Sequence, residues 1–182
     1  MTTIQNSFND ACKAGDLKTV KSLAKGHQAD IHADDEWALR CVAENGHLDI
    51  VKYLAEEQHA DIHINNEYAL KWAAESEHFD TVKYLVEEQH ADIHIDDEYV
   101  LRFAAWNEHL EIALYFVDQG AEYDSLQEHE ETLPIYNKII EHVQEKEKQA
   151  EQSKQQQLYT KNIGVLKNTP SHKTVRRRPK GC

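Results

Sequence analysis

Apolar residues recur along much of the chain at the spacing of an α-helix. In residues 37–43, Leu39, Val42 and Ala43 are three and four positions apart, which places them on one face of a helix. Residues 48–57 have the same spacing. The pattern therefore predicts pairs of short helices, each pair joined by a tight turn.

Acidic and amide residues stand directly before the first helix of each pair. Asp34-Asp35-Glu36 recurs as Asn65-Asn66-Glu67 and as Asp96-Asp97-Glu98. Side chains of this kind accept hydrogen bonds from the free N–H groups of a helix start and interact favourably with its dipole. We expect them to be N-caps, and we expect extended connectors, such as residues 59–63, between the pairs.

The helix pairs belong to a sequence repeat of 31 residues. Asp30-Ile31-His32 returns at the same spacing in each unit, and repeats 30–60 and 61–91 agree at 19 of 31 positions. Repeat 92–122 agrees with the second at 13 of 31 positions, and residues 4–29 form a degenerate first unit. Because a lone helix pair cannot bury its apolar face, stacked units are expected to share one core. The fold expected is an all-α helical solenoid over residues 1–124.

The C-terminal part differs in composition from the repeats. Residues 125–158 are expected to form a capping helix with a polar helical extension, because Ile135, Ile139, Ile140 and Val143 make one apolar stripe at its start. Residues 159–182 contain a basic cluster with Pro and Gly, and we expect them to be disordered.

The repeat resembles a known family. Ala-Glu-Asn-Gly-His-Leu-Asp-Ile-Val-Lys-Tyr-Leu (43–54), followed by Ala60-Asp61-Ile62, is similar to the ankyrin repeat. The combination with Asp-Ile-His and Glu-Tyr-Ala-Leu resembles the ankyrin repeat proteins that giant DNA viruses of amoebae (mimivirus-like) encode in many copies. The resemblance covers roughly residues 4–124. It implies an ankyrin-type solenoid, a viral protein and a role in protein–protein interaction.

The resemblance also indicates where a partner would bind. The connector is about three residues shorter than the usual ankyrin connector, and the Thr-Pro-Leu-His start of the first helix is absent. This moves the expected contact surface from the connector tips to the concave face made by the first helices. The candidate partner-binding residues are Trp37, Arg40, Glu44, Tyr68, Lys71, Glu75, Tyr99, Arg102 and Trp106.

Two of the aromatic features have alternative interpretations. Trp37, Tyr68 and Tyr99 recur once per repeat, either stacking between repeats or forming a strip offered to a partner. Trp106 stands where Glu44 and Glu75 stand in earlier repeats. It is either covered by the capping helix or exposed as an anchor for a partner.

The histidines have a structural interpretation. His47, His78 and His109 recur once per repeat in the turn between the helices, and the family resemblance implies that they hydrogen-bond the backbone of a neighbouring repeat. The pairs His59/His63 and His90/His94 lie in connectors, where their spacing does not indicate a metal site. No nucleophile–base pair or phosphate-binding loop is recognisable, so we expect no cofactor, no metal and no enzymatic activity.

Composition and charge narrow the choice of partner. The 182 residues are 40% hydrophobic and 29% charged, with three scattered cysteines. We therefore expect a monomeric intracellular protein, in the host cytoplasm or the nucleus, without a membrane span. Residues 1–143 carry 10 Lys and Arg against 30 Asp and Glu, a net charge of −20. This charge disfavours nucleic acid as a partner of the array and favours a protein with a basic patch.

The basic tail supports a second hypothesis. Residues 144–182 carry 10 Lys and Arg against 3 Glu, a net charge of +7. This segment would suit a nuclear import signal or a nucleic-acid contact. Its basic cluster consists of Lys173, Arg176, Arg177, Arg178 and Lys180.

Overall fold

A computed structural model describes residues 3–167 and divides the chain into two compact units. The first unit comprises residues 1–140 and the second residues 141–182. All the helix pairs lie in the first unit, and the long C-terminal helix begins in the first unit and continues into the second.

The described chain is helical and, over residues 3–167, has no strand. Each repeat supplies two antiparallel helices, as the apolar spacing predicted, and the second helix of repeat 30–60 ends in a π-helical turn, η2. The elements are α1 (Thr3–Ala14), α2 (Leu17–Ala24), η1 (Lys25–His27), α3 (Ala33–Glu44), α4 (Leu48–Lys52), η2 (Tyr53–Glu57), α5 (Ile64–Glu75), α6 (Phe79–Glu87), α7 (Ile95–Trp106), α8 (Leu110–Asp118), η3 (Asp124–Glu128) and α9 (Leu133–Lys167).

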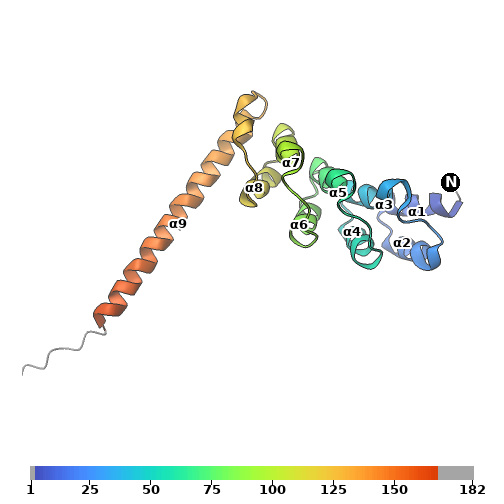
Figure 1. The fold of residues 1–182 in the computed structure, drawn as a ribbon, viewed down its shortest axis with the longest axis horizontal. Coiled ribbons are helices and arrows are strands. Elements are labelled where there is room, and N and C mark those ends of the chain that lie inside the picture. The colour runs from blue at the N-terminus through green and yellow to red at the C-terminus, as the bar shows by residue number, and fades with distance from the viewer. Residues whose placement is uncertain (1–2, 168–182) are drawn as a thin grey trace, which may run out of the picture. The chain divides into compact units, whose positions relative to one another are not determined.

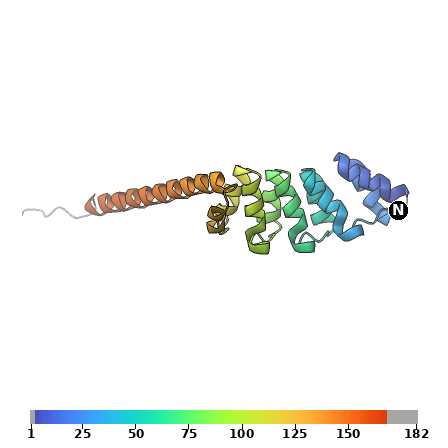
Figure 2. The ribbon, with the colours of Figure 1, turned by 90° about the horizontal axis from the view of Figure 1, so that it is seen from above.

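The helices of residues 1–140 form two layers. The first helices α1, α3, α5 and α7 contact one another in that order, and the second helices α2, α4, α6 and α8 do the same. Figure 1 shows α3, α5 and α7 in one row with α4, α6 and α8 in the other, and Figure 2 shows the pairs following one another along the array. This arrangement confirms the expected all-α solenoid. Its core is lined by fully buried apolar residues from every pair, including Phe8, Leu39, Leu54, Leu70, Leu85, Leu101, Ile112 and Phe116.

Small residues allow the first helices to pack closely. Ala43, Ala73, Ala74, Ala104 and Ala105 have at most 1% of their surface exposed. Side chains without bulk at these positions let neighbouring helix axes approach toward the lower end of the usual range of about 8–10 Å. The close packing brings the outward-facing residues of successive repeats into contact.

The acidic residues before the first helices are not N-caps, so that prediction was wrong. Asp34, Asp35 and Glu36 have φ values of 53°, 54° and 57°, which lie in the left-handed region. The N-cap residue His32 makes no side-chain capping hydrogen bond. The equivalent residues 65–67 and 96–98 have the same left-handed backbone. Each repeat therefore begins with a left-handed turn, a conformation that costs about 1–2 kcal/mol for each residue with a side chain.

A buried glutamate holds the left-handed turn in place in repeats 30–60 and 61–91. Glu36 is 4% exposed, and its Oε1 lies 2.6 Å from Nδ1 of His32 in the same repeat. The same oxygen accepts a hydrogen bond from the backbone N–H of Asp61, the first residue of the next repeat, at 3.1 Å. Glu67 is equally buried and makes the corresponding contacts with His63 and the Asp92 N–H, at 2.6 and 3.1 Å. We call this arrangement the glutamate clasp. It links the turn of one repeat to the backbone of the next.

Repeat 92–122 has the histidine–glutamate contact of the clasp. Nδ1 of His94 lies 2.6 Å from Oε1 of Glu98, and this hydrogen bond raises the pKa of His94 above its usual value, with smaller contributions from Asp92 and Glu122. A raised pKa in the folded state means that the protonated pair stabilises the fold fully below the unfolded pKa of about 6.5. That contribution to stability is lost as the pH rises through the raised pKa of His94 in the folded state.

We expect the substitution His94→Gln to destabilise the array more in mildly acidic than in alkaline solution. The free energy of unfolding of the wild type and of the variant, measured by urea titration at about pH 5.5 and about pH 8.5, gives the difference at each pH. The difference should be larger at the lower pH. An equal difference at both values would show that the protonated pair contributes nothing to stability.

The turn between the two helices of a repeat also uses left-handed backbone. Gly46 has φ +70°, and a Cβ built there would lie 2.4 Å from Nδ1 of His78 in the next repeat. Glu77 and Glu108 occupy the equivalent turn positions with φ values of 61° and 60°. The turn histidine of the repeat that follows the Glu77 turn is His109, and its Nδ1 lies 3.1 Å from the Ala74 carbonyl oxygen. A side chain is thus tolerated at this turn position in later repeats.

We expect Gly46→Ala to lower the free energy of unfolding by about 2 kcal/mol, because it combines left-handed strain with displacement of the His78 ring. Gly26→Ala is the matched control, since Gly26 has φ +71° and nothing within 4 Å of the added Cβ. This control should lose only about 1 kcal/mol. Equal losses in the two variants, measured by urea denaturation, would show that the His78 ring imposes no constraint.

Helix α9 starts as part of the first unit. Ile135 and Ile139 have at most 1% of their surface exposed, whereas Ile140 and Val143 are half-buried. Beyond residue 144 the described side chains are exposed, in keeping with a polar extension. The helix continues to Lys167, so residues 159–167 are helical and the expectation of disorder from residue 159 was wrong for them. No helix among the described residues is long and apolar enough to cross a membrane.

Candidate interaction surface

The nine candidate partner-binding residues lie on one side of three neighbouring helices. They recur at spacings of three and four residues, which places them on one face of each helix, and the three helices contact one another in sequence. None of the nine is buried. We call this surface the first-helix face. It consists of Trp37, Arg40 and Glu44 of α3, Tyr68, Lys71 and Glu75 of α5, and Tyr99, Arg102 and Trp106 of α7.

Cations from one repeat lie over aromatic rings of the next along this face. Arg40 lies 5.4 Å from the ring centroid of Tyr68, and Lys71 lies 5.2 Å from that of Tyr99. At the N-terminal end, Lys13 of α1 lies 5.5 Å from the ring of Trp37. Within residues 3–167, no ring contact joins Trp37, Tyr68 and Tyr99, so the hypothesis that these rings stack on one another was wrong. Cation–π contacts join the repeats instead.

The same cations are fixed by the left-handed turns. Arg40 donates from Nη2 to the Asp34 carbonyl oxygen at 2.7 Å, and Arg102 donates from Nη1 to that of Asp97 at 2.7 Å. Lys71 forms an ion pair with Asp96 of the next repeat at 2.7 Å, which lowers the pKa of this carboxyl group. The charged groups Arg40, Lys71 and Arg102 of the first-helix face are therefore held in place by contacts within the array.

A hollow lies at the N-terminal part of the face. Its volume is about 510 Å³, and its wall includes Trp37, Arg40 and Glu44 from the expected set. Trp72 of α5 also lines it, although sequence reasoning did not select this residue. In repeats 30–60 and 92–122, Cys41 and Phe103 occupy the position of Trp72. Cys41 is buried at this position, whereas Trp72 and Phe103 are half-buried, so the repeat pattern gave no clear signal for selecting Trp72.

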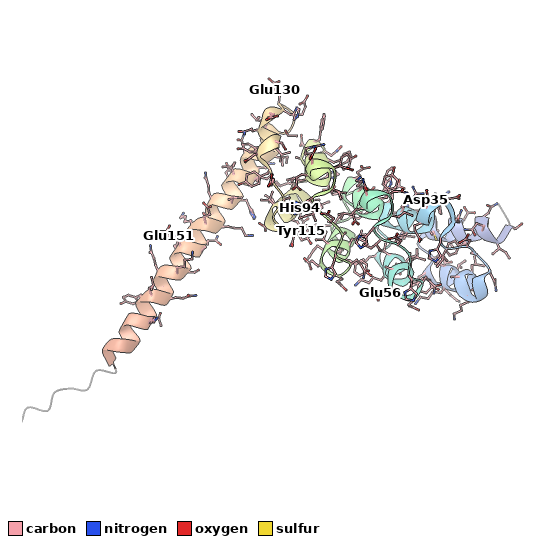
Figure 3. The ribbon with its side chains drawn as sticks, viewed as in Figure 1. Asp35, Glu56, His94, Tyr115, Glu130 and Glu151 are labelled. Carbon is pink, nitrogen blue, oxygen red and sulfur yellow. The ribbon has the colours of Figure 1, made fainter. Side chains whose placement is uncertain are left out.

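Trp106 is at the C-terminal end of the face and is 60% exposed. The capping helix does not cover it, so the interpretation of Trp106 as a residue buried under the cap was wrong. Its ring stacks on the ring of His129, with centroids 6.2 Å apart and planes 17° apart. Figure 3 shows Glu130, the next residue, in the segment that leads into α9.

The second-helix row is occupied by contacts between repeats. Tyr84 donates from its hydroxyl group to Glu56 at 2.9 Å, and Tyr115 does the same to Glu87 at 3.3 Å. Burial raises the pKa of Tyr115 to about 12. Figure 3 shows Glu56 on this row and Asp35 on the row of first helices. Lysines of this row pair with glutamates of the following repeat, Lys21 with Glu57 and Lys52 with Glu88, at 3.0 and 3.7 Å.

The turn histidines lie against the preceding repeats. Nε2 of His47 is 3.1 Å from the Lys13 carbonyl oxygen, and Nδ1 of His109 is 3.1 Å from that of Ala74. The ring of His78 occupies the space that a Cβ atom on Gly46 would need. Each ring thus spans the boundary between two repeats at the turn.

The thiols of Cys12 and Cys41 are buried. Burial raises the pKa of the Cys12 thiol to about 12 and also raises the pKa of Cys41, so both thiols stay protonated at neutral pH. Within residues 3–167, no three His, Cys, Asp or Glu side chains are grouped as metal ligands. The basic cluster from Lys173 to Lys180 lies outside the described residues.

Comparison with known families bears on the repeat region. Residues 8–97 and 60–127 match the family model for ankyrin repeats in three copies, and together the matches span more than half of the chain. No relative was found among curated proteins.

Proposed function

This chain belongs to the ankyrin repeat family, and we propose that it is a non-catalytic interaction module that holds a partner protein on its first-helix face. Proteins of this family are generally protein–protein interaction modules. The observation that supports this surface is the combination of exposed aromatic rings with cations already fixed by the left-handed turns. Tyr68 is 36% exposed and Trp106 is 60% exposed. Tyr, Trp and Arg are the residues that most often dominate binding energy at interfaces.

The net charge of the array favours a partner with a basic patch. With a net charge of −20 over residues 1–143, the array attracts cations at a distance, and salt screens this attraction. We propose that the chain acts as a monomer, with residues 1–124 as the binding array. The rate of association with its partner should then fall as ionic strength rises. A rate independent of salt would overturn the basic-patch proposal while leaving the first-helix face intact.

The short sequence motifs within the repeats support two further parts of the proposal, the origin of the protein and its location in the cell. Asp-Ile-His and Glu-Tyr-Ala-Leu favour an origin among giant DNA viruses of amoebae. Such a protein would act inside the host cell, in the cytoplasm. Capturing partners from lysates of amoebal cells is therefore the appropriate experiment.

The test compares a variant of the first-helix face with a control on a different part of the chain. The variant Glu44→Arg/Tyr68→Ala changes two exposed residues of α3 and α5, and Tyr159→Ala removes an aromatic ring that is 64% exposed on α9. The face variant should capture at least about tenfold less partner, since truncating a central interface residue typically costs more than 1 kcal/mol. The control should capture as much as the wild type. Equal capture by all three proteins, each folded by circular dichroism, would refute the proposed surface.

The charge of the C-terminal segment supports a second candidate function. Residues 144–182 have a net charge of +7, which suits a nuclear import signal or a nucleic-acid contact. Deleting residues 173–180 while keeping the array should then abolish nuclear localisation and leave partner capture unchanged. Unchanged localisation after the deletion would refute this second candidate.

A further inference from the structure

The C-terminal end of the first-helix face differs chemically from the rest. Trp106 stands at the repeat position that Glu44 and Glu75 occupy in the two preceding repeats. The substitution replaces a carboxylate with the largest aromatic side chain and leaves that ring mostly exposed, as described above. Because burial of such a ring is favourable, its exposure marks a surface that gains free energy when covered.

Trp106 borders a second hollow of the face. This hollow has a volume of about 370 Å³ and is lined by Tyr99, Arg102, Phe103, Trp106 and Asn107, all from α7 and the residue after it. The rings of Tyr99 and Phe103 stack with centroids 5.9 Å apart and planes 25° apart. Three aromatic rings therefore form most of the wall, and an apolar side chain is the group that such a wall accepts best.

The wall of this hollow is fixed in advance. The Tyr99 hydroxyl group donates to Glu75 Oε1 at 3.1 Å, which ties the ring to the preceding repeat. The Arg102 guanidinium is held by its hydrogen bond to the Asp97 carbonyl oxygen, and His129 stacks on Trp106. A guest side chain therefore enters a prepared site and does not have to order it, which favours binding.

The wall of the hollow contains one charged residue, the cation Arg102, whereas the chain segment that follows Arg102 is acidic. Residues 103–137 contain eight Asp and Glu and no Lys or Arg, and all eight acidic residues are exposed. Glu108 follows Trp106 by two positions, and Glu128 and Glu130 flank His129 in the chain. The residues that bring carboxylates to this end of the array are Glu108, Glu111, Asp118, Glu122, Asp124, Glu128, Glu130 and Glu131.

We propose that the hollow beside Trp106 is an anchor pocket for one large apolar side chain, carried by a lysine- or arginine-rich segment of the partner protein. The apolar side chain contacts the rings of Tyr99, Phe103 and Trp106. The flanking cations meet the carboxylates of the segment that follows Arg102. This inference rests on the proposed function and specifies the chemistry of the partner at one end of the first-helix face.

The probes for the test are three fluorescein-labelled heptapeptides whose binding to the full chain is followed by fluorescence anisotropy. The first has one phenylalanine between two runs of three lysines, the second has alanine in place of phenylalanine, and the third has glutamates in place of the lysines. The phenylalanine–lysine peptide should bind about tenfold more tightly than the alanine–lysine peptide, as expected for adding contacts between aromatic rings. The phenylalanine–glutamate peptide should bind more weakly than both.

Variants of the chain locate the contact. Trp106→Ala should remove most of the advantage of phenylalanine over alanine while leaving the affinity for the alanine–lysine peptide nearly unchanged. If the alanine variant does not fold, Trp106→Glu, which restores the residue of the two preceding repeats, should likewise remove most of the advantage of phenylalanine over alanine, while its added carboxylate acts equally on both lysine peptides. Tyr159→Ala, which removes an equally exposed aromatic ring from α9, should bind all three peptides as the wild type does.

Each contrary outcome overturns a defined part of the inference. If the phenylalanine and alanine peptides bind equally, the hollow is not an anchor pocket. If the glutamate peptide binds best, the partner segment is not basic. If Trp106→Ala lowers the affinity for both lysine peptides equally, the ring contributes only general contact area. Partner capture that fails in Glu44→Arg/Tyr68→Ala but persists in Trp106→Ala would leave the proposed function standing and refute the anchor alone.

Discussion

Replacing Ile139 with alanine is expected to lower the free energy of unfolding of the array by about 3 kcal/mol, within the range found when a fully buried isoleucine is truncated. Ile139 has no exposed surface, although the described side chains of its helix are exposed beyond residue 144. Since Ile139 is buried and belongs to the same compact unit as the repeats, we propose that the start of α9 closes the C-terminal end of the core. Urea denaturation of the full chain measures this effect.

The neighbouring residue provides the control for this prediction. Ile140 has the same side chain and lies in the same helix but is only half-buried. Ile140→Ala should therefore lower the free energy of unfolding roughly half as much as Ile139→Ala. Equal effects for the two substitutions, or an effect of Ile139→Ala below about 1 kcal/mol, would show that α9 does not cap the array.

Replacing Glu67 with alanine is also expected to cost about 3 kcal/mol, because each hydrogen bond to a charged group contributes about 1.5–3 kcal/mol. Glu67 is 4% exposed and accepts from His63 in its own repeat and from the backbone N–H of Asp92 in the next. The second carboxylate oxygen of Glu67 is buried without a hydrogen-bond partner among the described residues. That burial offsets part of the gain, so the expected loss is smaller than the sum of the two hydrogen bonds.

A double-mutant cycle separates the two hydrogen bonds. Because His63 is 55% exposed in its side chain, His63→Ala alone should cost about 1 kcal/mol or less. The combination His63→Ala/Glu67→Ala should then cost about as much as Glu67→Ala by itself, since the glutamate carries both contacts. Strictly additive losses would show that Glu67 and His63 do not act through one another.

The glutamate clasp explains why the repeats tolerate strained backbone. Three successive left-handed residues per repeat are unfavourable on their own, yet this turn orients the carbonyl groups that hold Arg40 and Arg102 on the first-helix face. The clasp also fixes the turn relative to the following repeat, because Glu36 accepts from the Asp61 N–H and Glu67 from the Asp92 N–H. Stability in such arrays depends on contacts between neighbouring repeats. The same residues therefore stabilise the stack and position the binding surface.

The helix pairs were predictable because their cause is local. The spacing of Leu39, Val42 and Ala43 shows which side of α3 is apolar. The 31-residue repeat shows that the same helix pair recurs along the chain. The nine residues of the first-helix face were chosen from what the ankyrin resemblance implies, and helical spacing places those of each helix on one side. Residues at helical spacing share one face of a helix, whichever elements pack against that helix.

The left-handed turns were not predictable from local rules. Asp34-Asp35-Glu36 has the composition of an N-cap, and composition alone does not reveal that Glu36 becomes buried against the next repeat. One signal was present in the sequence: the glutamate recurs four residues after the histidine in every repeat, while the two residues before it change between Asp and Asn. A charged residue retained where its neighbours vary indicates a specific contact.

By itself, the amino-acid sequence determined that this protein is a stack of two-helix units with an acidic array, a basic C-terminal segment and an aromatic side on its first helices. These properties depend on residue type and spacing, which act over one or two helical turns. The tertiary structure alone decided that cations separate the aromatic rings, that Glu36 and Glu67 are buried, and that Trp106 is exposed. Those outcomes depend on which atoms of a neighbouring repeat arrive within a few ångströms, and this distance is set only when the repeats pack together.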